Sequence, residues 1–335
     1  MAFNPAIALV GVDWGTTHRR AYGLDASGRC VAEWADDQGA LACKGRFPAA
    51  LQALLNHLGA QPRSVILSGM VGSALGWQVV PYVDGGVALP ELAQHLLVLD
   101  AGALTVGPEP DAVGAAHAEA VSGATPAWTV AIVPGYCVRS ASGQPDVMRG
   151  EETQLLGAHG LGHSDGWFVL PGTHSKWVEL RAGRVAQLRT YMTGELFDLL
   201  GHHGTLAAAA GSAEAPWDEA AFAQGVQAAQ GGGALSHQLF GCRARVVSGD
   251  MAAPSSRAYL SGLLIGTELH DVLHDPAGGA TAAGQAATFQ LIGSPALATL
   301  YQAAAAILGL QFEVLDARAA FIAATYFLAS HRISA

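Results

Sequence analysis

The chain has 335 residues, 51% of them hydrophobic and 13% charged, which excludes a disordered protein and provides enough apolar side chains for a large core. Its formal net charge is -10 with only 17 lysines and arginines, which argues against nucleic acid and anionic membranes as partners. The four cysteines form no CxxC pair, and we find neither a signal-peptide pattern nor an apolar run long enough to cross a bilayer, so we expect a reduced, cytoplasmic protein.

Hydrophobic patterning predicts strands that alternate with helices along the chain. Strands are expected at residues 6–12, 64–70 and 129–135, and helices at residues 47–59, 149–162 and 256–273. The segments 288–310 and 311–331 each have the pattern of a strand followed by a helix. An alternation of this kind is typical of the α/β class.

Two segments of the chain repeat one plan. VDWGTTHRRAYGLDASGRCVA (12–32) and VLPGTHSKWVELRAGRVAQ (169–187) each contain an apolar strand, a Gly-Thr corner, a second strand and a turn that ends in Gly-Arg. Such repetition predicts two lobes of similar fold, and two unrelated hairpins with common turn residues are the alternative. We expect a first lobe over residues 1–160, a second over residues 161–316, and a C-terminal helix over residues 317–335 that folds back on the first.

Each Gly-Thr corner is a candidate phosphate site, because glycine lets backbone N–H groups approach an anion closely and threonine hydroxyls add further donors. The first corner contains Gly15, Thr16 and Thr17, and the second contains Gly172 and Thr173. Neither lysine lies in a G-x-x-x-x-G-K-[ST] sequence, and we find no G-x-G-x-x-G. A nucleotide would therefore be held without a Walker loop.

Acidic residues precede both corners in the sequence: Asp13 comes just before the first, and Glu151 and Glu152 come before the second. Asp13 would repel a phosphate directly, but it suits a Mg²⁺ ion that bridges carboxylate and phosphate oxygens; a turn-capping aspartate is the plain alternative. Glu151 and Glu152 lie at the start of a predicted helix, where a carboxylate could accept a hydroxyl proton during phosphoryl transfer or could simply cap the helix. Because adjacent helical residues point in different directions, only one of the two is expected to enter the site.

A third candidate region lies near the C-terminus. LIGSPALATLY (291–301) predicts a strand, then Gly293, an N-cap at Ser294 and a helix. A helix N-terminus directly after a strand is a natural place for part of a nucleotide, and a plain connection between the two elements is the alternative.

Seven motifs of the chain together point to a known family. They are DWGTTHRRAY, SGMVGSALGW, VMRGEETQLLGA, LPGTHSKWV, RTYMTGEL, YLSGLLIGTEL and LIGSPALATLYQAA, in this order over most of the chain. With them the sequence resembles the sugar kinase, Hsp70 and actin superfamily, and within it the 2-dehydro-3-deoxygalactonokinase family. The resemblance implies an α/β fold of two ribonuclease-H-like lobes, with an interlobe cleft that holds ATP and Mg²⁺. It also implies that ATP phosphorylates the 6-hydroxyl of 2-dehydro-3-deoxy-D-galactonate in galactonate catabolism.

The resemblance also suggests roles for individual residues. Asp13 takes the metal position, whereas Pro171 replaces the aspartate that begins the second motif in many superfamily members, so we expect only one lobe to supply a metal-binding aspartate. Comparison with the exopolyphosphatase branch favours Glu152 as the catalytic base, with Glu151 as the second choice. Gly293 and Ser294 occupy the adenosine motif. The candidates for contact with the sugar acid or the phosphate, led by arginines because their fork binds a carboxylate in two contacts, are Arg20, Arg149, His174, Lys176 and Trp14.

Other functions are compatible with parts of this pattern. One is a related kinase for the gluco epimer of the sugar acid, and another is an exopolyphosphatase-like hydrolase of the same fold with water as the acceptor. A third is an actin-like or chaperone-like nucleotide switch. We expect a small sugar acid and ATP as partners, and a homodimer is one candidate for the oligomeric state.

Overall fold

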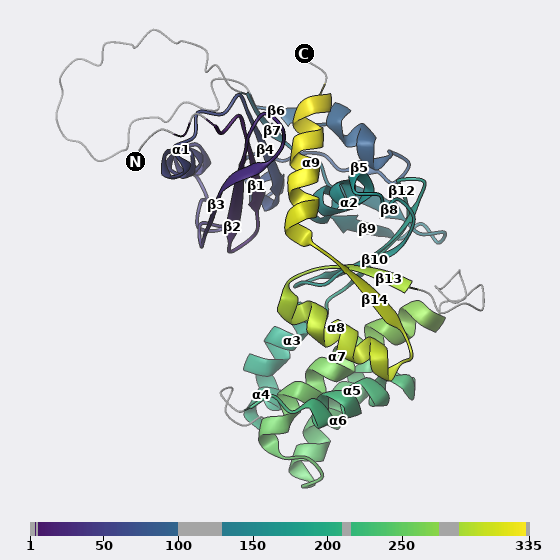
Figure 1. The fold of residues 1–335 in the computed structure, drawn as a ribbon. Coiled ribbons are helices and arrows are strands. Elements are labelled where there is room, and N and C mark those ends of the chain that lie inside the picture. Colours follow the sequence, from purple (N-terminus) through teal and green to yellow (C-terminus); the bar gives the residue numbers. More distant parts are fainter. Residues whose placement is uncertain (1–3, 5, 100–128, 210–215, 275–287, 333–335) are drawn as a thin grey trace, which may run out of the picture. The chain divides into compact units, whose positions relative to one another are not determined.

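The computed structural model describes residues 4, 6–99, 129–209, 216–274 and 288–332 (Figure 1). The chain divides into two compact units. Unit 1 comprises Met1–Asp165, Arg181–Ala186 and Arg318–Ala335, and unit 2 comprises Gly166–Leu180 and Gln187–Ala317.

Unit 1 is built on a six-stranded sheet in the order β3-β2-β1-β4-β7-β6. Its strands are β1 (Leu9–Trp14), β2 (Arg19–Leu24), β3 (Cys30–Asp36), β4 (Ser64–Gly69), β6 (Leu97–Val98) and β7 (Thr129–Ile132). Strands β1 to β3 form an antiparallel meander, and β4 and β7 continue the sheet parallel to β1. The apolar strand β1 is central and almost entirely buried, and helix α1 (Phe47–Leu58) packs its apolar side chains into the same core.

Unit 1 also contains a smaller three-stranded sheet, whose last strand comes just before the paired glutamates in the sequence. Its strands are β5 (Val83–Asp84), β8 (Tyr136–Arg139) and β9 (Pro145–Met148), and the short helices η1 (Met70–Gly72) and η2 (Leu89–Gln94) belong to the same unit. Helix α2 (Glu151–Gly160) begins shortly after β9 ends. The sequence patterning did not predict this sheet, because strands of two to four residues are too short to show a period.

The C-terminal helix α9 (Ala317–His331) belongs to unit 1 almost entirely and lies between the strands of the large sheet and α2 (Figure 1). Two glycines allow this close approach. A Cβ atom on Gly11 of β1 would lie 2.5 Å from Thr325 Oγ1, and one on Gly157 of α2 would lie 1.7 Å from the carbonyl oxygen of Ala320. Both distances are shorter than any real contact, so only glycine fits at these two places.

Unit 2 repeats the plan of the first sheet. Its five strands lie in the order β12-β11-β10-β13-β14, with β10 antiparallel to β11 and parallel to β13. They are β10 (Gly166–Leu170), β11 (Ser175–Arg181), β12 (Arg184–Tyr191), β13 (Thr288–Ile292) and β14 (Gln311–Leu315). The shared strand order confirms the predicted α/β class with two ribonuclease-H-like sheets.

Helices cover the sheet of unit 2 (Figure 1). They are α3 (Thr193–His202), α4 (Gly204–Ala209), α5 (Glu219–Gln230), α6 (Leu235–Val247), α7 (Ser256–His274) and α8 (Pro295–Ile307). Trp177 and Phe289 of the sheet share one buried core with Leu263 of α7 and Tyr301 of α8. Among the described residues, no helix combines the length and the apolar character that a membrane crossing requires.

Candidate functional site

The first Gly-Thr corner closes the β1–β2 hairpin, with the Gly15 N–H donating to the His18 carbonyl at 2.9 Å. The loop at residues 39–41 braces it, because three of the loop's amides donate to the carbonyls of Thr17, Gly15 and Thr16 at 3.2, 2.9 and 3.1 Å. Within the described part of the chain, the N–H groups of Thr16 and Thr17 have no backbone acceptor, and both side chains are exposed. The corner therefore presents donors, rather than carbonyls, to an anion.

The second corner is built in the same way in unit 2. The start of α3 braces it: the Glu195 N–H donates to the Thr173 carbonyl at 2.9 Å, and a Cβ on Gly194 would lie 2.3 Å from the Gly172 carbonyl oxygen. The Glu195 carboxylate also lies 2.5 Å from Nε2 of His174. In both units, the residues that brace the corner come directly after the third strand of the meander, so the repetition seen in the sequence extends to the support of each corner.

Asp13 is placed beside the first corner by strand register. It lies opposite Arg20 on β2 and opposite Ser68 on β4. Its side chain is 30% exposed, and its carboxylate lies 3.9 Å from the Arg20 guanidinium, which is itself mostly exposed. Burial raises the pKa of Asp13, and the charge of Arg20 opposes this shift.

A magnesium ion fits this corner if its ligands come partly from a protein carboxylate and partly from oxygens of the substrate. Among the described residues there is no group of three or more His, Cys, Asp or Glu side chains that could hold a metal by themselves. Mg²⁺ is commonly bound through one or two carboxylates together with phosphate oxygens and water. The partly exposed Asp13, next to a corner of free amides, meets that requirement.

Glu152 is the buried member of the glutamate pair. Its Oε2 accepts the Gly150 N–H at 2.7 Å and its Oε1 accepts the Thr153 hydroxyl at 3.3 Å. Burial, and secondarily the charge of Glu151, raises the pKa of Glu152 to about 8. Glu151 is only half-buried, and its carboxylate accepts the Arg149 N–H at 3.0 Å.

A hydrogen bond connects the start of α2 to β4, the strand next to the one that carries Asp13. The hydroxyls of Thr153 and Ser68 lie 2.6 Å apart, and both residues are fully buried. Because Ser68 is the register partner of Asp13, the end of β1 and the start of α2 meet in unit 1. Asp13, the first corner and Glu152 are thus parts of one region.

Arg149 has an arrangement that suits an anionic ligand. Its Nη2 donates to the Val80 carbonyl at 2.7 Å, and its guanidinium carbon lies 4.4 Å from the centre of the Tyr82 ring. Its Nε and Nη1 are buried and have no acceptor within the described residues. An unsatisfied buried N–H costs about 1–3 kcal/mol, and an anionic oxygen that accepts from either of these groups would recover that cost for the group it binds.

Two of the predicted contact residues face elsewhere. Trp14 lies in the core of unit 1 with 0% exposure, packs against Phe47 and donates its indole N–H to the Gln38 carbonyl at 2.9 Å, so this position gives its expected contact with the substrate no support. Lys176 is buried and its ammonium donates to the Thr190 hydroxyl at 2.9 Å. Its contact with a substrate stays a prediction.

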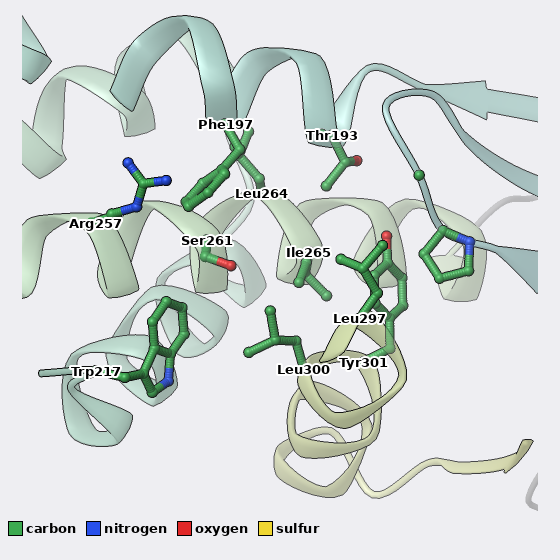
Figure 2. Close-up of a pocket in the computed structure, with 13 residues that line it drawn as sticks. Thr193, Phe197, Trp217, Arg257, Ser261, Leu264, Ile265, Leu297, Leu300 and Tyr301 are labelled. Carbon is green, nitrogen blue, oxygen red and sulfur yellow. The ribbon is translucent and has the colours of Figure 1, made fainter. Parts of the chain in front are cut away.

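A pocket of about 270 Å³ in unit 2 adjoins the second corner (Figure 2). Phe197, Trp217 and Arg257 lie toward one end of it, and Thr193 and Tyr301 lie toward the other. Its lining residues are Pro171, Gly172, Thr193, Gly194, Phe197, Trp217, Arg257, Ser261, Leu264, Ile265, Leu297, Leu300 and Tyr301. Apolar and aromatic walls with a few polar groups are typical of a small-molecule site.

The predicted nucleotide residues lie at the start of a helix that lines this pocket. Ser294 is the N-cap of α8, as expected, and its hydroxyl accepts the Leu297 N–H at 3.4 Å. A Cβ on Gly293 would lie 3.1 Å from Pro171 of the second corner. Gly172 is among the lining residues, whereas Gly293 and Ser294 are not. The sequence analysis assigned no site role to the other lining residues, although the motifs LPGTHSKWV, RTYMTGEL, YLSGLLIGTEL and LIGSPALATLYQAA contain most of them.

Comparisons with known proteins agree with this geometry. A protein-family model described as 2-keto-3-deoxy-galactonokinase matches residues 13–327, from the aspartate of the first corner to the C-terminal helix. The chain belongs to the 2-keto-3-deoxy-galactonokinase family. It is therefore a kinase, and the predicted family resemblance is confirmed.

Relatives of this kinase family cover most of the chain. A Rhizobium meliloti protein named as a 2-dehydro-3-deoxygalactonokinase is 35% identical over 311 residues, which is 91% of each chain. The Escherichia coli 2-dehydro-3-deoxygalactonokinase is 34% identical over 261 residues, which is 78% of each chain. A crystal structure described as a 2-dehydro-3-deoxygalactonokinase from Sinorhizobium meliloti superposes with a TM-score of 0.77 at 34% identity and covers 96% of this chain and 95% of that one.

Proposed function

We propose that this kinase transfers the γ-phosphoryl group of ATP to the 6-hydroxyl of 2-dehydro-3-deoxy-D-galactonate, in the catabolism of galactonate in the cytoplasm. The observation that carries the proposal is the family match from residue 13 to residue 327, which includes both corners and the paired glutamates. The relatives named above are supporting evidence because each matches over more than three quarters of the chain.

In this proposal Glu152 acts as the base. The O6–H bond breaks as O6 attacks the γ-phosphorus, and the bond from that phosphorus to the β,γ-bridging oxygen breaks to release ADP. Glu152 takes the proton of O6, for which its carboxylate must first be ionised. The two donors from Gly150 and Thr153 hold this carboxylate at the start of α2.

The corners and the pocket are assigned to ATP. In unit 1, the free amides of Thr16 and Thr17 bind phosphate oxygens. In unit 2, the second corner at Gly172 and Thr173 binds phosphate oxygens, and the adjoining pocket takes the adenosine. Asp13 would hold Mg²⁺, whose charge would help to stabilise the transferred phosphate. In such a transfer the protein contributes mostly positioning and charge stabilisation.

A coupled ATP-consumption assay across a panel of 3-deoxy-2-keto sugar acids tests the proposed function. We expect the largest kcat/KM for the galactonate derivative, with little ATP consumption in the absence of a sugar acid. A larger kcat/KM for the gluco epimer would reassign the substrate, and equal ATP consumption without any sugar acid would indicate a hydrolase instead.

Arg149 is assigned to the carboxylate of the sugar acid, since its Nε and Nη1 are buried without an acceptor. Replacing Arg149 with lysine keeps the charge but removes the separate N–H donors of the planar guanidinium. We expect KM for the sugar acid to rise by about 10- to 100-fold, the equivalent of one or two charge-assisted hydrogen bonds, with a much smaller change in KM for ATP. Initial-rate kinetics with each substrate varied separately measure this split.

Arg29 provides the matched control for the Arg149 experiment. It is an arginine whose side chain is 78% exposed and which pairs with Asp25 in the β2–β3 turn. Arg29→Lys should leave both KM values unchanged. If Arg149→Lys behaves like this control, the carboxylate is bound by another residue, for which Arg20 is the next candidate.

A further inference from the structure

A buried carboxylate lies at the centre of unit 2, away from the paired glutamates. Glu268, in the middle of α7, is 1% exposed. Its Oε1 accepts the Ser175 hydroxyl at 2.7 Å and the Trp177 indole N–H. Its Oε2 accepts the Thr193 hydroxyl at 2.6 Å, and the Tyr301 hydroxyl donates to both oxygens at 3.1 and 3.0 Å.

The four donors come from three separate elements that surround the nucleotide region. Ser175 and Trp177 lie on β11, just after the second corner. Thr193 begins α3, whose next two residues brace that corner, and Tyr301 lies on α8. Thr193 and Tyr301 also line the pocket, toward the same end of it (Figure 2). One side chain therefore connects the corner to the pocket wall.

The chemistry of the donors requires an acceptor at this place. An indole N–H can only donate, and all four partners of Glu268 are neutral groups that donate to it. Burial raises the pKa of Glu268, and the four hydrogen bonds oppose this shift. A buried charge without a cationic partner is expensive, and an apolar side chain would avoid the cost. An apolar side chain, however, could not fix donors from three elements in one geometry.

We infer that Glu268 is a positioning residue that holds the second corner and the polar end of the pocket in the arrangement that binds the nucleotide. The inference rests on the proposed use of ATP. Glu268 itself does not line the pocket and acts through Ser175, Thr193 and Tyr301.

A glutamine at position 268 changes the hydrogen bonds of the buried side chain and leaves its size unchanged. The side-chain oxygen of Glu268→Gln can still accept from Ser175 and Trp177, whereas its NH₂ group replaces the oxygen that faces Thr193. The Thr193 hydroxyl would then have to turn from a donor into an acceptor, and the Tyr301 hydroxyl could donate only to the remaining oxygen. The variant keeps the size of the buried side chain and alters the pocket side of the network.

The test is calorimetric titration of ADP into the full-length protein, with no sugar acid present. For Glu268→Gln we expect the Kd for ADP to rise by about tenfold or more, while KM for the sugar acid stays within about twofold of the wild type. The matched control is Thr267→Val on the same helix, since the Thr267 hydroxyl donates to the Leu263 carbonyl of its own helix at 2.7 Å and has no other partner in the part of the chain that the structure describes. It should not change ADP binding.

A second variant keeps the inference testable if Glu268→Gln fails to fold. Ser175→Ala removes one donor at a residue that does not line the pocket, and we expect a rise in the Kd for ADP of about threefold to tenfold. An unchanged Kd for ADP in whichever of the two variants folds would overturn this inference and leave the proposed function standing. Failure of the unmodified protein to bind ADP would overturn both the inference and the proposed function.

Discussion

Replacing Glu152 with glutamine is expected to lower kcat by about 10²- to 10⁴-fold, the usual contribution of a positioned general base. The amide cannot take the proton of the 6-hydroxyl, but it fills the same buried space and can still accept the Gly150 N–H. The melting temperature should therefore not fall appreciably. Steady-state kinetics together with thermal unfolding followed by circular dichroism check the two halves of this expectation.

Glu151→Gln is the matched control for this change. Glu151 is only half-buried and its carboxylate caps the Arg149 N–H, so its amide variant should lose less than about tenfold in kcat. A Glu152→Gln enzyme with near-wild-type turnover would remove Glu152 from the role of base. A larger loss in the Glu151 variant would move that role to Glu151.

The raised pKa of Glu152 adds a pH signature to the same experiment. Because the carboxyl titrates at about 8 in the folded protein, kcat/KM of the wild type should rise with pH and level off above this value. The contribution of Glu152 to stability has the opposite slope. It is fully present below the ordinary pKa of 4.5 and is lost as pH rises through 8, because the unfolded chain releases this proton first. Both slopes should disappear in Glu152→Gln.

Asp13→Asn is expected to lower kcat by about 10²-fold or more and to weaken the dependence of activity on Mg²⁺. Mg²⁺ favours a carboxylate over a neutral amide, and strand register places the carboxylate of Asp13 beside the first corner. The variant should stay folded because the side chain is partly exposed and its pairing with Arg20 is loose, at 3.9 Å. Magnesium titrations of the initial rate, at saturating ATP, measure the effect.

Asp25→Asn separates loss of metal binding from a general effect of charge on this hairpin. Asp25 lies in the turn at the opposite end of β2, where it accepts hydrogen bonds from Ser27 and Arg29 that hold its pKa at about 2. We expect this variant to lose some stability and to keep its magnesium dependence. If Asp13→Asn retains wild-type kinetics, the metal is held by substrate oxygens and other residues.

The repeated hairpins were predictable because a strand, a Gly-Thr corner and a second strand are all local patterns. The N-cap at Ser294 and the end of α1 at Gly59 were predictable for the same reason, since both depend on neighbouring residues alone. The pocket was not, because it assembles residues as distant as Pro171 and Tyr301. Its walls depend on how helices pack on the sheet, which no short window of sequence encodes.

Strand alternation also left open which face of each strand is buried. Arg19 and Arg20 are adjacent, yet Arg19 is buried in a hydrogen-bonded pair with Asp36, whereas Arg20 is exposed. The same alternation could not show which face of β1 carries the Trp14 indole, and the structure places this indole in the core. A single acidic residue in the apolar run YLSGLLIGTEL was a visible signal for Glu268, but its partners lie far away in the sequence.

The glycines that receive α9 have a consequence for biosynthesis. Strand β1 leaves the ribosome long before the helix that packs against it at Gly11, because all of unit 2 lies between them in the sequence. Phe321, Thr325 and Leu328, which α9 buries, become available only after those intervening residues have been made. The first sheet therefore emerges with an uncovered apolar surface, and it completes its fold only after unit 2 has been synthesised.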